Sequence, residues 1–171
     1  MSATAAALMP LSEPDGAAIL ELERGSRGQG SGLGQEDLRG CWRLQRLWDR
    51  QARPLQVAAG LLRPLAASLS LTPGEHGQLA VRNSVRLGGL EVRFMGAGEL
   101  RGRRPLLVFW FDRLELRLGE RRLWQRPLAR PAERSLPFFA LIASRREGEK
   151  AWLVARGRGG GLALWRREPL T

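Results

Sequence analysis

Few residues of this sequence could perform catalysis. The chain has one histidine, His76, and one cysteine, Cys41. His76 stands in a glycine-rich turn without the nucleophile elbow that accompanies many Ser-His-Asp triads. A zinc site needs several His, Cys or carboxylate ligands, and the supply of His and Cys is too small. We therefore predict no catalytic residue, no metal ligand and no cofactor, and we interpret the protein as a non-enzyme.

The glycine run near the end of the sequence is expected to be structural. Residues 157–161 (Gly-Arg-Gly-Gly-Gly) lack the Lys-Ser/Thr pair of a phosphate-binding loop, and the residues after them are typical of a strand. The acidic residues are scattered among arginines, as on a solvated surface. Paired carboxylates for acid–base catalysis are therefore not indicated.

Tryptophan is more informative, because six are present in 171 residues. Each ring can pack in a core, line an apolar cavity, or lie at a membrane interface with its N–H hydrated. The sequence leaves these roles open. The six are Trp42, Trp48, Trp110, Trp124, Trp152 and Trp165.

The charge is strongly basic. There are 28 Lys and Arg against 17 Asp and Glu, a net charge of +11. Such a surface predicts an anionic partner: acidic lipid headgroups, nucleic acid or an acidic protein. No apolar run approaches the ~20 residues of a membrane helix, and residues 1–11 lack the positive charge of a secretory signal. With one cysteine, a reducing, cytoplasmic setting is expected.

Alternating apolar and polar residues predict short antiparallel strands. The alternation is clearest at 79–87, and Gly88-Gly89 predicts a tight hairpin into a strand at 90–94. About eight strands with frequent glycine turns favour a barrel or sandwich, and closure removes exposed sheet edges. We predict a mainly β fold, a single antiparallel barrel. The other expected strands are at 38–44, 68–72, 106–111, 114–118, 151–155 and 162–165.

A short helix is expected before the barrel, and we expect it to plug or flank one end of the barrel. Ser12 can cap it, Pro14 suits its first turn, and Gly25 would end it. The Gly/Ser-rich residues 25–34 are typical of a flexible linker. We therefore divide the chain into residues 1–34, helix and linker, and residues 35–171, the barrel domain, in which residues 54–65 are helical or irregular.

Four aromatic residues on the predicted strands are candidates for an apolar cavity: Phe94, Phe109, Phe111 and Trp152. Phe109 and Phe111 share one face of the most apolar strand. Phe94 lies opposite the face that carries Glu91 and Arg93, which favours the interior. A barrel of about eight strands can hold one small ligand or a packed core, so these rings either line a cavity or fill the barrel.

Two segments resemble a known family. Gly40-Cys41-Trp42 has the form of the Gly-x-Trp strand that begins lipocalin-like barrels. Residues 153–165 resemble the closing hairpin of the plastid lipid-associated proteins, or fibrillins, which reads hydrophobic-x-Arg-Gly-x-x-Gly before an alternating apolar strand. The chain departs from the family at Arg46-Leu47-Trp48, where an aromatic-Thr pair is usual, and at Arg158, where an acidic residue is usual.

The resemblance implies a lipocalin-like barrel that binds an apolar ligand such as a lipid, carotenoid or quinone. It also implies peripheral association with thylakoid membranes and a role in photosynthetic cells. Trp42 is expected near one end of the barrel, with Arg166 or Arg167 stacked over its ring. Trp42 joins the four cavity candidates in the predicted ligand-binding set.

Two other functions stay open. A bilin lyase, an enzyme class that also uses lipocalin-like barrels, would hold an open-chain tetrapyrrole. A nucleic-acid-binding or protein-docking barrel would use the basic surface, and Trp124 between Arg122 and Arg126 is a hint of it. Because no recognised RNA-binding signature is present, nucleic acid is the less favoured partner. An apolar small molecule and an anionic membrane surface are the expected partners.

Overall fold

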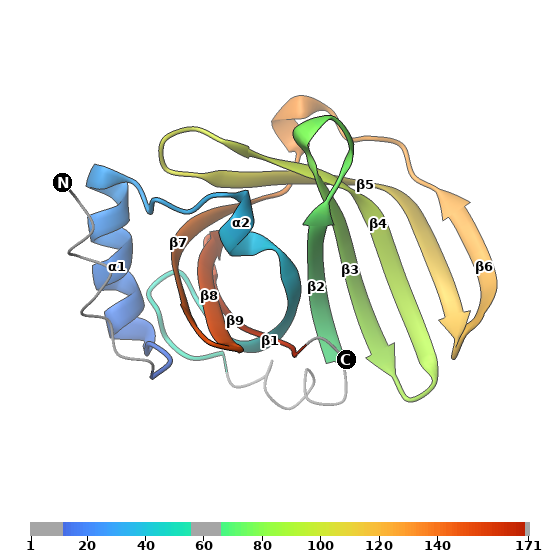
Figure 1. Ribbon diagram of the computed structural model, residues 1–171, viewed down its shortest axis with the longest axis horizontal. Helices are drawn as coiled ribbons and strands as arrows, with labels where there is room; N and C mark the ends of the chain where they lie inside the picture. Colours follow the sequence, from blue (N-terminus) through green and yellow to red (C-terminus); the bar gives the residue numbers. More distant parts are fainter. Residues whose placement is uncertain (1–11, 56–65, 170–171) are drawn as a thin grey trace.

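The protein is a closed antiparallel β-barrel with one main helix on its outside. The computed structural model describes residues 12–55 and 66–169, so the stretch expected at 54–65 falls almost entirely outside it. Within the described residues, nine strands form one sheet in the order β4-β3-β2-β1-β9-β8-β7-β5-β6. An extra pairing of β4 with β5 closes eight of them into a ring, and β6 pairs with β5 outside it (Figure 1). The predicted fold class is confirmed.

The bounds of the elements are as follows. The helices are α1 (Gly16–Gln29) and α2 (Gln35–Leu38), with short 3-10 turns η2 (Glu75–Gly77) and η3 (Glu133–Ser135). The strands are β1 (Gly40–Trp48), β2 (Ala66–Pro73), β3 (Leu79–Leu87), β4 (Leu90–Arg101), β5 (Leu106–Leu118), β6 (Arg121–Pro127), β7 (Phe138–Glu147), β8 (Lys150–Gly157) and β9 (Leu162–Arg167).

The predicted strands are present, several of them longer than the sequence indicated. β3 spans the expected residues, and Leu87 pairs with Leu90 across the two-glycine turn. Gly88 adopts a φ of 59°, which glycine tolerates at little cost and which this tight turn requires. β6 and β7 were not anticipated.

β5 gives the barrel its open side. Its first three residues pair with β7, whereas its last six pair with β6. The ring therefore closes only along the first part of β5. The far halves of β3, β4 and β5, together with β6, fan away from the ring on the right of Figure 1.

α1 lies against the outer wall of the barrel and does not plug its end. Asp15, not Ser12, is the N-cap, and its side chain accepts a hydrogen bond from the Ala18 N–H at 2.9 Å. The helix continues through Gly25 to Gln29, so the linker shortens to residues 30–34. Ile19 is fully buried against the outward side chains of β7, β8 and β9.

Candidate functional site

A row of aromatic rings leads from the fanned sheet into the barrel interior. The ring centroids of Phe94 and Phe111 lie 5.3 Å apart, and those of Phe111 and Phe109 lie 5.6 Å apart. The row continues through Phe139 to Trp165, with steps of 5.2 and 5.1 Å. The three phenylalanines expected to share the interior therefore lie together. Toward its Trp165 end the row belongs to the packed core, where Phe109 is 7% exposed.

Trp152, which we expected with these rings, lies on the other side of the barrel wall. Its neighbour Leu153 pairs with Trp165 and packs in the interior cluster. Because side chains alternate along a strand, Trp152 faces outward, where it packs in the cluster that contains Ile19 of α1. The strand at 151–155 is apolar on both faces, so the sequence could not decide which face is interior.

Trp42 is buried at the end of the barrel near α2. Its indole Nε1 donates a hydrogen bond to the Leu38 carbonyl at 2.7 Å. Arg167 is its cross-strand partner and shares its face. Arg166 faces the other way and pairs with Glu13, at 2.8 Å from Nε to Oε1. Of the two candidates, Arg167 is therefore the one that shares the face of Trp42, and the stacking itself stays a prediction.

The fanned part of the sheet presents a face of apolar side chains, which we call the apolar ladder. Its rungs follow from the strand register: one joins Val85, Val92, Leu116 and Trp124, and the next joins Leu87, Leu90 and Leu118. Four members are solvent-exposed: Leu87 by 57%, Leu90 by 39%, Leu118 by 53% and Trp124 by 48%. A further rung, Phe94 and Leu114, connects the ladder to the aromatic row.

Arginines of β6 border the ladder. Arg121 pairs with Leu118 and Arg126 pairs with Leu114, so both lie at the edge of the same face, and both are exposed. The Gly119 N–H donates a hydrogen bond to the Gly89 carbonyl at 2.9 Å, which joins the tips of the β3–β4 and β5–β6 hairpins. The ladder is therefore one continuous surface.

The opposite face of the same strands carries ion pairs. Glu91 is buried beside Arg93, 2.9 Å from Nη2 to Oε2, and Glu115 is buried among three arginines at 3.6–3.7 Å. Burial alone would raise the pKa of Glu91, but its hydrogen bond to Arg93 and nearby arginine charges hold the pKa below its usual value. This part of the sheet is thus amphipathic, with compensated charges on one face and exposed leucines on the other.

The ladder was not predicted as a site. Its leucines appeared in the sequence as ordinary members of alternating strands. The available signal was the Leu87-Gly-Gly-Leu90 hairpin, which places two leucines at a tip where little can cover them. Without β6, the edge of the sheet and the position of Trp124 could not be inferred.

The other chemistry-bearing residues do not converge. His76 is exposed in the turn between β2 and β3. Cys41 is half-buried, and burial together with its hydrogen bond to Glu168 raises the pKa of the thiol to about 11. Across residues 12–55 and 66–169, no group of three His, Cys, Asp or Glu side chains could hold a metal ion. No helix in the same ranges is long and apolar enough to cross a membrane.

Comparison of the chain with protein-family models and with curated proteins finds no match.

Proposed function

We propose that this protein is a non-catalytic lipid-binding protein that attaches peripherally to anionic membranes and takes an apolar ligand at the open side of its barrel. The apolar ladder carries this proposal. Contiguous exposed apolar surface of this kind marks interaction sites, and a bilayer interface suits it best because leucines, a tryptophan and arginines meet on one face.

The side-chain types match the depths of a bilayer interface. Leu87, Leu90 and Leu118 would enter the acyl region, where each fully buried leucine contributes roughly 1.5–3 kcal/mol. Trp124 would lie at headgroup level. Arg121 and Arg126 would meet anionic headgroups, at about 1 kcal/mol each. By the strand register, no acidic side chain lies on this face of the described sheet.

The apolar ligand is proposed from the continuity between surface and core. Phe94 and Phe111 are half-buried between the exposed ladder and the packed interior. A lipid, carotenoid or quinone leaving a membrane at the ladder would meet these rings first. The resemblance of residues 153–165 to plastid lipid-associated proteins points to the same ligand class, with thylakoids as the membrane.

Tryptophan fluorescence provides a direct test. Five tryptophans are at most 8% exposed, so Trp124 is the indole that vesicle lipids can reach without unfolding the protein. Vesicles that contain phosphatidylglycerol and acyl-brominated lipid should quench part of the emission. Trp124→Phe should abolish that quenching while leaving binding largely intact. Quenching that persists in Trp124→Phe would contradict the proposed orientation.

Vesicle co-sedimentation tests the ladder. The double variant Leu87→Ser, Leu118→Ser should lower affinity for anionic vesicles at least tenfold, because the apolar contribution is removed. Leu55→Ser is the matched control, since Leu55 is 44% exposed but lies after β1, away from the ladder. Equal loss in both variants, or equal binding to neutral vesicles, would remove the membrane proposal. Tighter retention on single-stranded DNA than on vesicles would favour the nucleic-acid alternative.

A further inference from the structure

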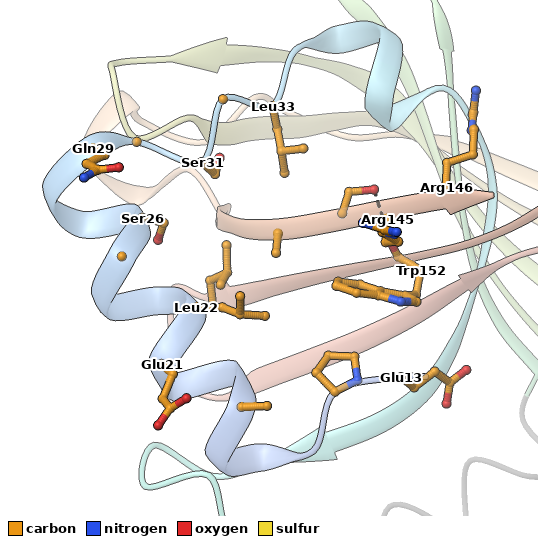
Figure 2. A pocket seen from close by; sticks show the side chains of 18 of the residues that line it. Glu13, Glu21, Leu22, Ser26, Gln29, Ser31, Leu33, Arg145, Arg146 and Trp152 are labelled. Carbon is orange, nitrogen blue, oxygen red and sulfur yellow. Dashed lines mark hydrogen bonds between the residues drawn. The ribbon is translucent and has the colours of Figure 1, made fainter. Parts of the chain in front are cut away.

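A concave surface lies between α1 and the outside of the barrel, on a different wall from the ladder. Figure 2 shows it from close by: α1 forms one side, β7 and β8 form the floor, and the linker after α1 closes the top. Its volume is about 1330 Å³, above the 300–1,000 Å³ typical of small-molecule sites. We call it the helix groove.

One apolar and several polar contacts hold α1 against the outer wall of the barrel, and the groove runs along one side of the helix. Ile19 anchors the helix in the outer apolar cluster, and the buried Glu23 carboxylate accepts hydrogen bonds from Arg156 at 2.6 and 2.7 Å and from Arg104 at 2.9 Å. Leu22 and Ser26 face the groove in Figure 2, and Glu21 borders it from the exposed side of α1.

The floor of the groove is apolar. Ile142, Ala143 and Trp152 are each less than 8% exposed and border it, and Leu22 and Leu33 border it from the helix and the linker. Two polar groups at its lining lack a hydrogen-bond partner in the described structure, Nε1 of Trp152 and Oγ of Ser31. An oxygen-bearing ligand could satisfy such donors after a small adjustment of the lining.

One end of the groove is cationic. Arg145 lies at that end in Figure 2, on the outward face of β7 that it shares with its cross-strand partner Trp152, whereas Arg146 pairs with Ala151 and faces the other way. Of the acidic side chains that line the groove, Glu13 pairs with Arg166 and Asp15 caps α1. The groove therefore combines an apolar floor with an arginine at one end. This pattern suits a ligand that has an apolar acyl chain and an anionic head group.

We infer that the helix groove binds an anionic acyl-chain amphiphile, with the chain along Leu22, Ile142 and Trp152 and the carboxylate or phosphate head at Arg145. This site is separate from the ladder and does not depend on the proposed membrane function. The shared head chemistry admits two sources, a free fatty acid or a lysophospholipid.

Uptake of cis-parinaric acid by the full chain tests the site. Ala18 borders the groove, whereas Ala17, the preceding residue of α1, is exposed to solvent. Ala18→Phe should therefore abolish uptake, and Ala17→Phe should not. Arg145→Glu should weaken binding at least tenfold. Lys150→Glu makes the same charge change outside the groove and should have no effect. The two charge variants keep the test decisive if Ala18→Phe lowers stability.

Three outcomes would overturn the inference: equal uptake by all four variants, equal binding of the parinaric methyl ester, or no displacement by oleate or lysophosphatidate. The relative strength of these two competitors distinguishes the carboxylate from the phosphate source. The ladder variant Leu87→Ser, Leu118→Ser should retain uptake, and Ala18→Phe should retain vesicle binding. Failure of one site is therefore distinguishable from failure of the other.

Discussion

At the scale of single residues, Glu23 is the most consequential side chain outside the two surfaces. It is 2% exposed and shares its carboxylate among Arg156, Arg104 and Arg27. The hydrogen bond from Arg156 is the largest cause that lowers the pKa of Glu23, to about 2, and it outweighs the opposing effect of burial. Since the folded pKa lies below the ordinary value of 4.5, this carboxylate stabilises the fold at neutral pH.

We expect Glu23→Gln to lower the free energy of unfolding at pH 7 by roughly 3 kcal/mol, because it leaves partly buried arginines without their counter-ion. The wild-type advantage should shrink as pH falls from 4.5 to 2, where Glu23 itself becomes protonated. Urea denaturation across this pH range measures it. Glu21→Gln, on the exposed side of α1, is the control and should change little. A pH-independent difference would argue against the ion cluster.

At the scale of elements, α1 offers a simple test of where the helix ends. Gly25 lies inside the helix with ordinary helical φ, and a Cβ atom added there would meet no atom of another element within 4 Å. We expect Gly25→Ala to stabilise the protein by about 0.5–1 kcal/mol, because alanine loses less backbone entropy on forming a helix. Thermal unfolding measures the gain. Destabilisation would show that residues 25–29 are not helical.

Gly96 is the contrasting position in the sheet. A Cβ atom there would lie 2.0 Å from the Trp110 carbonyl oxygen of β5, beside the register shift between β4 and β5. Gly96→Ala should therefore lower stability in the same assay, because the β4–β5 pairing closes the barrel.

At the scale of the whole molecule, the net charge of +11 gives the protein a long-range attraction for anionic surfaces. Raising salt from 0.1 to 1 M shortens the screening length from about 10 to 3 Å. Binding to anionic vesicles should therefore fall steeply over this range, whereas parinarate uptake, which combines a single charge contact with a long apolar contact, should fall less. Co-sedimentation and fluorescence titration at matched salt concentrations measure both. Salt-independent vesicle binding would show that charge does not drive attachment.

Much of the architecture follows from the sequence alone. The alternation in β3 and the Gly88-Gly89 turn predict a hairpin because strand and turn preferences depend on residues only a few positions apart. β7 escaped prediction because four successive residues, Ala140 to Ala143, are buried, between the barrel interior on one side and outer packing on the other. Such a run shows no period of two.

Only the tertiary structure showed which residues form the apolar ladder and the helix groove. The six tryptophans look alike in the sequence, yet Trp42 and Trp165 face the interior, Trp152 lies under α1, and Trp124 is exposed on β6. Composition and local pattern determined a basic, mainly β protein with one histidine and one cysteine. Closure of β4 on β5 and the docking of α1 decided which face of each strand is covered. Neighbours along the chain set the conformation of a strand, but only partners distant in sequence determine what its two faces contact.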